Sequence, residues 1–131
     1  MVAYMDSSAA VKLVHREVQT DALLQWLNSQ ASLRMMSSVL IEIELNRALL
    51  RYDPEALPRV PGVLARIARI ELHAAVRAAA SAYRQPLLRS LDAIHLATAN
   101  SLSAGVDAFV TYDARLASVA HAEHFDVVMP H

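Results

Sequence analysis

Four short runs of mainly apolar residues are spaced along the chain, at residues 2–5, 33–37, 108–112 and 125–129. Each run has the length of an ordinary strand, and residues that favour turns or helix starts flank it. Apolar runs that do not alternate strictly with polar residues are typical of strands buried on both faces. The pattern therefore predicts a sheet of short strands that is covered from both sides.

Between these runs, apolar residues recur with the spacing of helices. Helices are predicted over residues 9–15, 18–28, 38–51, 61–83, 91–102 and 114–121. Serines stand at three of the expected helix starts as candidate N-caps, namely Ser7 or Ser8, Ser37 or Ser38, and Ser90. We expect Gly105 to close the helix that Ser90 begins, and we note a potential break near residues 70–72 in the alanine-rich central helix.

Strands and helices that alternate in this way predict an α/β fold with a mostly parallel central sheet. A chain of 131 residues suits a single domain, residues 1–131, and a hydrophobic content of 55% argues against disorder. No apolar run approaches the roughly 18 residues that a membrane span needs. Charged residues from Asp6 onward exclude a secretory signal, so we expect a cytoplasmic protein that does not bind membranes.

Charge and cysteine content restrict the chemistry. The sequence has no cysteine, so a metal ion would need oxygen or histidine ligands. The net charge is only −1, but eight of the eleven arginines lie between Leu45 and Leu91 with three acids. Solvated helix faces are the simpler explanation of this basic segment, and a surface for a phosphate backbone is the other.

Three aspartates occupy junctions between predicted elements. Asp6 follows the first strand, Asp92 lies in the first turn after Ser90, and Asp113 follows the third strand. The carboxyl ends of parallel strands are where open α/β sheets bind ligands. The sequence thus directs several carboxylates toward one edge of the sheet.

A fourth carboxylate comes from the helix predicted over residues 38–51, which contains Glu42 and Glu44. Two positions along a helix correspond to about 200°, so the two glutamates point in nearly opposite directions. Glu44 has Leu40, Ile41 and Ala48 as neighbours one turn away and therefore lies on the more apolar, inward face. A carboxylate there is costly unless it is paired, protonated or bound to a cation.

Each acid alone has a simpler explanation, as a helix cap, a favourable charge at a helix start or a partner of an arginine. Together, four carboxylates at one edge would repel one another unless a divalent cation neutralised them. Oxygen ligands alone favour Mg²⁺ or Mn²⁺, and no histidine pair has the spacing of a zinc site.

Four segments that contain these acids resemble, in order, the motifs of PIN-domain ribonucleases, and most closely the VapC toxins of bacterial toxin–antitoxin pairs. The segments are Val-Ala-Tyr-Met-Asp6-Ser-Ser-Ala, Ser-Ser-Val-Leu-Ile-Glu-Ile-Glu44-Leu, Leu-Arg-Ser-Leu-Asp92-Ala-Ile-His-Leu-Ala-Thr-Ala and Val-Thr-Tyr-Asp113-Ala-Arg-Leu. The third is the most specific. Two departures are the absence of the usual glycine at residues 122–125 and the additional acid Glu42.

The resemblance implies a PIN-like three-layer α/β/α domain whose matching acids Asp6, Glu44, Asp92 and Asp113 bind one or two Mg²⁺ or Mn²⁺ ions. We expect Asp6 and Asp92 to be direct ligands, and Glu44 and Asp113 to act through water or to hold a second ion. Ser8 and Thr111 match small hydroxyl positions that support the site. A divalent ion in such a site can catalyse hydrolysis of RNA phosphodiester bonds.

Arginines of the basic segment are the candidates for binding RNA phosphates. Arg89 is close to Asp92 in the sequence, and Arg47 lies one turn beyond Glu44. The few aromatic residues are scattered, so we expect recognition by backbone shape and charge rather than by base stacking. His95, one turn after Asp92, is a proton donor, a more remote ligand or, as we favour, a packed histidine hydrogen-bonded in the core.

The partners follow from composition and from the resemblance. Apolar N-terminal helices favour a homodimer. The resemblance implies a small cognate antitoxin that places a basic side chain among the acids, and a toxin that inhibits translation and growth when free of it.

Other classes of function are less consistent with the sequence. A receiver domain needs a lysine late in the chain, and a dehalogenase-type phosphatase needs a second aspartate where Ser8 stands. The stronger alternative is a non-catalytic PIN-fold module that binds RNA or a partner protein.

Overall fold

The sheet has five strands, all parallel, in the order β3-β2-β1-β4-β5. A computed structural model describes residues 1–102 and 105–131 of the chain. The strands are β1 (Val2–Met5), β2 (Arg34–Ser38), β3 (Ile67–Ile70), β4 (Ala108–Val110) and β5 (Val127–Val128). The predicted α/β fold with a mostly parallel sheet is confirmed.

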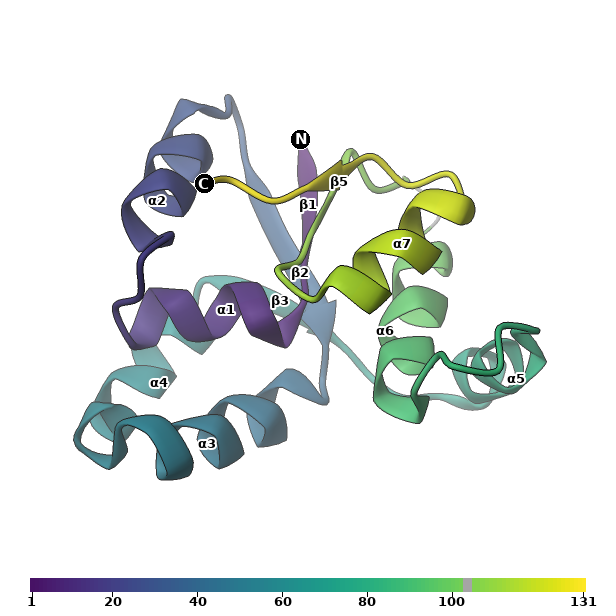
Figure 1. Cartoon of the computed structure of the whole chain (residues 1–131), viewed down its shortest axis with the longest axis horizontal. Coiled ribbons are helices and arrows are strands. Elements are labelled where there is room, and N and C mark those ends of the chain that lie inside the picture. The colour runs from purple at the N-terminus through teal and green to yellow at the C-terminus, as the bar shows by residue number, and fades with distance from the viewer. Residues whose placement is uncertain (103–104) are drawn as a thin grey trace.

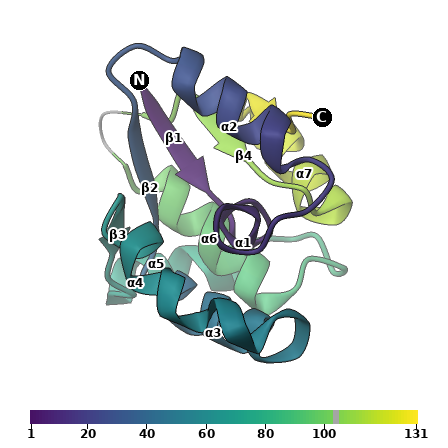
Figure 2. The ribbon, with the colours of Figure 1, turned by 90° about the vertical axis from the view of Figure 1, so that its left-hand side faces the viewer.

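Seven α-helices and one 3₁₀ helix connect the strands within the described ranges. They are α1 (Ser7–Val14), α2 (Thr20–Ser29), α3 (Ile41–Tyr52), η1 (Pro54–Arg59), α4 (Val60–Leu64), α5 (Ala74–Ala82), α6 (Ser90–Asn100) and α7 (Ala114–Ala122). Figure 1 shows α1 to α4 on one side of the strands and α6 and α7 on the other, and Figure 2 gives the view from the first side.

Two apolar cores lie on the two faces of the sheet. Along β1, Ala3 and Met5 pack with residues of α1 to α4, whereas Tyr4 packs with Leu96 of α6 and Leu116 of α7. Successive side chains of a strand point to opposite faces, so β1 must be apolar throughout. This is the three-layer arrangement that the uninterrupted apolar run of β1 predicts.

The prediction of a helix over residues 61–83 is right about the break near residues 70–72 but wrong about the segment before it. The chain instead forms α4, the edge strand β3 and then α5. Ile67 is buried, whereas Ala68 and Arg69 are exposed, because β3 pairs with β2 alone at the rim of the sheet. The alanine-rich sequence around this short strand favours a helix in a prediction from local pattern. Pairing with β2 in the folded protein overrides that local helix propensity.

Several helix ends differ from the predicted ones by a few residues. The first helix begins at Ser7, and its N-cap is Asp6 rather than a serine. The helix predicted from residue 38 begins at Ile41, and α6 includes Ser90 and has Arg89 at its N-cap position. The prediction that Gly105 closes this helix is wrong, because α6 ends at Asn100 with Ser101 at its C-cap position. Gly105 itself has a φ of 80°, in the left-handed region that glycine adopts readily.

The parallel topology places the ends of β1 and β4 side by side, since Met5 pairs with Val110. The chain enters α1 directly after β1, and it enters α7 shortly after β4. This edge of the sheet, called here the carboxyl edge, therefore gathers Asp6, Thr111 and Asp113.

No helix in residues 1–102 or 105–131 is both long and apolar enough to cross a membrane.

Candidate active site

A hollow of about 900 Å³ lies at the carboxyl edge and is called here the acidic hollow. Residues from α1, α3, the start of α6 and the start of α7 line it. The four predicted acids are all among them, namely Asp6, Glu44, Asp92 and Asp113. The fold thus brings together four carboxylates, called here the acid cluster, from segments up to 107 positions apart in the sequence.

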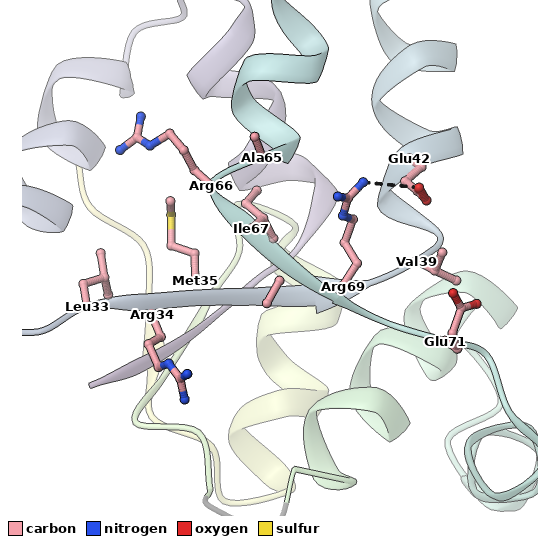
Figure 3. A pocket seen from close by; sticks show the side chains of 11 residues that line it. Leu33, Arg34, Met35, Val39, Glu42, Ala65, Arg66, Ile67, Arg69 and Glu71 are labelled. Carbon is pink, nitrogen blue, oxygen red and sulfur yellow. Dashed lines mark hydrogen bonds and ion pairs between the residues drawn. The ribbon is translucent and has the colours of Figure 1, made fainter.

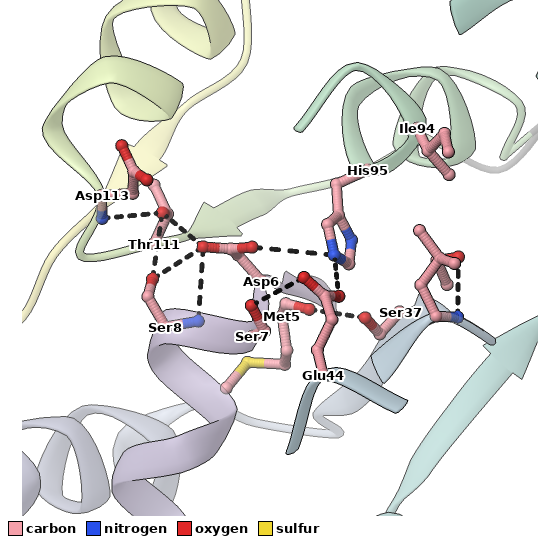
Figure 4. A network of polar contacts seen from close by, with 12 residues as sticks. Met5, Asp6, Ser7, Ser8, Ser37, Glu44, Ile94, His95, Thr111 and Asp113 are labelled. Atoms are coloured by element: carbon pink, nitrogen blue, oxygen red, sulfur yellow. Dashed lines mark hydrogen bonds and ion pairs between the residues drawn. The ribbon is translucent and has the colours of Figure 1, made fainter. Parts of the chain in front are cut away.

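Asp6 is buried, with 3% of its surface exposed, and three hydrogen bonds hold one of its oxygens. Its Oδ2 accepts from Ser8 Oγ at 2.7 Å, from Thr111 Oγ1 at 2.9 Å and from the Ser8 backbone N–H at 3.4 Å (Figure 4). Ser8 Oγ also accepts the backbone N–H of Tyr112 at 2.8 Å. The structure therefore places both predicted supporting hydroxyls on Asp6, and they join the end of β4 to the start of α1.

Glu44 faces the acidic hollow, and Glu42 does not. Glu44 accepts hydrogen bonds from His95 Nε2 at 2.6 Å and from Ser7 Oγ at 3.2 Å. Glu42 instead forms an ion pair with Arg69 of β3 at 3.2 Å. The helical periodicity of α3 correctly separates the two glutamates.

His95 is fully buried beneath the acid cluster. Its Nδ1 shares a hydrogen bond of 2.8 Å with the hydroxyl of Tyr4, and its Nε2 lies 3.8 Å from Asp6 Oδ1. The prediction of a packed, hydrogen-bonded histidine is confirmed. Figure 4 shows in addition that the ring points toward both Asp6 and Glu44, a contact that the sequence does not reveal.

Burial, hydrogen bonding and neighbouring charges shift the pKa values of two groups in the site. Burial of the ring lowers the pKa of His95, but the hydrogen bond to Glu44 and the charge of Asp6 outweigh this effect and raise the pKa above its ordinary value. Burial raises the pKa of Asp92 from 3.8 to about 6. The negative charges of Asp113 and Asp6 act on Asp92 in the same direction. The acids of the cluster therefore interact with one another and with His95.

Asp113 caps the start of α7 and also lines the acidic hollow. As its N-cap, it accepts the backbone N–H groups of Arg115 at 2.9 Å and Leu116 at 3.1 Å through Oδ1. Thr111 Oγ1 in turn accepts the backbone N–H of Asp113 at 3.1 Å. The simpler explanation of this residue as a cap is thus correct, and it remains compatible with a place in the acid cluster.

The donor set of the acid cluster suits Mg²⁺ or Mn²⁺. Among residues 1–102 and 105–131, no three Asp, Glu or His side chains are grouped closely enough to form a ready-made metal site. Mg²⁺ retains several water ligands, so its carboxylates need not all contact it directly. Burial and, after it, the charges of Asp113 and Asp6 raise the pKa of Asp92, and a divalent cation beside these carboxylates would favour their charged forms.

The two predicted phosphate ligands lie in different surroundings. Arg89 lines the acidic hollow, whereas Arg47 is not among its lining residues. Arg51 lines the hollow instead. On a helix, Arg51 lies about 20° around the axis from Glu44, whereas Arg47 lies about 60° from it. Arg51, one turn beyond Arg47, is therefore the better candidate on α3 for a phosphate ligand.

A second hollow, of about 640 Å³, runs along β2 and β3. Figure 3 shows Arg34, Arg66 and Arg69 around it, together with Glu42 and Glu71. None of the predicted site residues lines this hollow. The four predicted acids therefore all line the acidic hollow, and none of them lines the second hollow.

Comparison with known proteins agrees with this geometry. The family model described as PIN domain matches residues 3–122. Ribonuclease VapC35 of Mycobacterium tuberculosis is 50% identical over 129 residues, which cover 97% of this chain and 96% of that protein. Ribonuclease VapC47 of the same species is 37% identical over 130 residues, with the same two shares.

Solved structures share the fold at low sequence identity. VapBC2 from Rickettsia felis, solved bound to a DNA fragment from its promoter, superposes with a TM-score of 0.75 at 13% identity and covers 100% of both chains. VapC20 of Mycobacterium tuberculosis, a toxin that cleaves the sarcin-ricin loop, gives a TM-score of 0.71 at 14% identity, covering 91% of this chain and 95% of that one. The chain therefore belongs to the PIN-domain family and, within it, to the VapC-type ribonucleases.

Proposed function

We propose that this chain is a metal-dependent endoribonuclease that hydrolyses RNA phosphodiester bonds in the cytoplasm as the toxin of a toxin–antitoxin pair. The observation that carries the proposal is the convergence of Asp6, Glu44, Asp92 and Asp113 on the acidic hollow. The 50% identity with a ribonuclease over 97% of the chain supports the same activity.

Asp6 and Asp92 are the proposed direct ligands of Mg²⁺ or Mn²⁺, with Glu44 and Asp113 acting through water or holding a second ion. When bound, the ion supplies Lewis acidity and positive charge for hydrolysis of a phosphodiester. The protein's own contribution is rigid placement. Ser8 and Thr111 fix the carboxylate of Asp6, and His95 fixes that of Glu44, before substrate binds.

Substrate phosphates need positive charge beside the acid cluster. Arg89 precedes α6 and is exposed on the rim of the acidic hollow, close in sequence to Asp92. We therefore keep Arg89 as a proposed phosphate ligand. Arg47 is a weaker candidate, because its position on α3 directs it away from the lining of the hollow.

Two protein partners complete the proposal. Complexes of toxins with antitoxins share this fold, as in the VapBC2 complex and in a toxin–antitoxin complex from Klebsiella pneumoniae, which gives a TM-score of 0.70. We propose a cognate small antitoxin whose basic side chain enters the acid cluster, where it would replace the charge of the cation. Exposed apolar side chains such as Leu87 and Ile43, 83% and 63% exposed, support a homodimer.

The direct test is incubation of the purified protein with total cellular RNA in Mg²⁺, in Mn²⁺ and in EDTA, followed by mapping of new RNA ends. We expect discrete cuts with either metal, and none in EDTA or with the Asp6→Asn and Asp92→Asn variants. RNA binding without cuts under every condition would instead support the non-catalytic binding module. No feature of the site favours that alternative, since all four acids are present.

A further inference from the structure

The acidic hollow extends beyond the acid cluster, between α1 and α3. From α3 it is lined by Glu44, Ala48, Arg51 and Tyr52, which share one face of the helix at positions i, i+4, i+7 and i+8. Arg51 and Tyr52 lie about 10 to 12 Å along the helix axis from Glu44. We call this pair the far end of the hollow.

Other charged groups near the far end are already paired. Lys12 Nζ lies 2.8 Å from Glu17 Oε2, and His15 Nδ1 lies 3.1 Å from Asp53 Oδ2. Arg51 is exposed, and in the part of the chain that the structure describes no carboxylate lies within ion-pair distance of it. Arg51 is therefore the cation at this end that is available to an incoming anion.

Tyr52 adds an aromatic surface to this cation. Its side chain is 63% exposed, and the Arg51 guanidinium lies 5.5 Å from the centre of its ring. An exposed ring beside a guanidinium suits a nucleotide, because the base can stack on the ring and the guanidinium can bind the phosphate.

We propose that Arg51 and Tyr52 form a subsite for single-stranded RNA, with Arg51 on a backbone phosphate and Tyr52 stacked on an unpaired base. The inference rests on the proposed nuclease function and extends it, because a strand cut at the acid cluster must continue along the hollow. It departs from the expectation of recognition by backbone shape and charge rather than by base stacking. Stacking on one ring is tolerant of sequence, so the subsite would favour an unpaired nucleotide over any particular base.

The test measures binding of a fluorescein-labelled single-stranded RNA of mixed sequence to the Asp92→Asn protein, by anisotropy at several salt concentrations. On that background, Tyr52→Leu should weaken binding by about 5- to 150-fold without changing the salt dependence, and Tyr52→Phe should retain most of the affinity. Arg51→Gln should weaken binding and reduce the slope of log affinity against log salt by about 0.7. Arg34→Gln, which removes an exposed arginine from the second hollow, is the matched control and should bind as the parent does.

Two further results separate this subsite from the nuclease function. An RNA in which abasic sites replace the bases should bind the Tyr52→Leu and parent proteins equally. If the parent binds RNA and the wild-type protein cuts it, but Tyr52→Leu and Arg51→Gln bind as the parent does, the subsite is overturned and the nuclease stands. A loss of affinity for a partner protein in the two variants, with RNA binding unchanged, would overturn the subsite in the same way. If the wild-type protein neither binds nor cuts RNA, both proposals fail together.

Discussion

His95 and Glu44 form a partly buried hydrogen bond of 2.6 Å between α6 and α3, at the base of the acid cluster. The partners are 51 positions apart in the sequence, and the Nε2–H group of the histidine donates to the carboxylate. Tyr4 holds the other ring nitrogen at 2.8 Å, so the orientation of the imidazole is fixed from both sides. A carboxylate held in this way is positioned before metal or substrate arrives.

Replacing His95 by phenylalanine should leave a folded protein whose cleavage rate and Mn²⁺ affinity are each reduced by about 10- to 100-fold. The loss arises because Glu44 is no longer fixed. Cleavage of a mapped RNA site and Mn²⁺ titration would measure the two effects. Thr98→Val is the control, since Thr98 is equally buried on α6 and its hydroxyl donates to the carbonyl of Ile94 rather than to a carboxylate of the acid cluster. Unchanged Mn²⁺ affinity in the folded His95→Phe protein would contradict a positioning role.

The two glutamates of α3 provide a matched pair. Glu44→Gln removes a charge from the acid cluster and should lower the cleavage rate by at least about 100-fold. Glu42→Gln removes only the surface ion pair with Arg69, and surface pairs contribute about 0 to 1 kcal/mol. Its cleavage rate should match that of the wild type. Equal losses in the two variants would show that α3 is not oriented as described.

Ser8 and Thr111 should contribute to the stability of the folded protein. Ser8→Ala or Thr111→Val removes one hydrogen bond to the buried carboxylate of Asp6, and each should cost about 1 to 3 kcal/mol of unfolding free energy. Urea denaturation of the metal-free proteins would measure this. Ser81→Ala, on an exposed turn of α5, should change stability by less than about 0.5 kcal/mol. A Ser8→Ala protein as stable as this control would contradict the network around Asp6.

Asp92 should make the metal-free protein less stable as the pH rises. Its pKa is about 6 in the folded protein and 3.8, its ordinary value, in the unfolded chain, so between these values the folded state binds more protons. Unfolding free energy should therefore fall between about pH 4 and pH 6 and stay low above that range. Below about pH 4 both states are protonated, so the effect disappears.

The variant Asp92→Asn isolates this contribution. At about pH 7.5 it should be more stable than the metal-free wild type by about 1 to 2 kcal/mol, a discounted value because solvent reaches part of the side chain. At about pH 3 the advantage should be absent. Addition of Mg²⁺ should stabilise the wild type more than the variant. Thermal unfolding at the two pH values, with and without Mg²⁺, checks all three statements, and an equal advantage at both pH values would refute them.

Residues whose roles follow from local pattern were predictable from the sequence. The junction positions of Asp6 and Asp113, and the inward face of Glu44, depend on strand ends and helix periodicity, both of which the sequence displays. The apolar run of β1 likewise predicts a strand buried on both faces.

Features that depend on packing between distant segments were not predictable. β3 is a strand because it pairs with β2, not because residues 67–70 favour one. The contact of His95 with Glu44 depends on how α6 crosses α3, which the sequence does not show. Preferring Arg51 to Arg47 as a lining residue likewise depends on knowing in which direction the acidic hollow extends along α3.

The glycine expected near residue 124 is replaced by His124, which adopts a φ of 69°. A non-glycine residue can occupy that region at a modest cost.

The most direct test of the central claim, that the acid cluster holds a divalent cation, is a Mn²⁺ titration followed by electron paramagnetic resonance. Metal-stripped wild-type protein should bind one or two ions. Asp6→Asn and Asp92→Asn should each lose at least one of them, while Glu42→Gln keeps them all. Full Mn²⁺ binding by folded Asp6→Asn and Asp92→Asn proteins would contradict the claim, because the ion would then lie elsewhere.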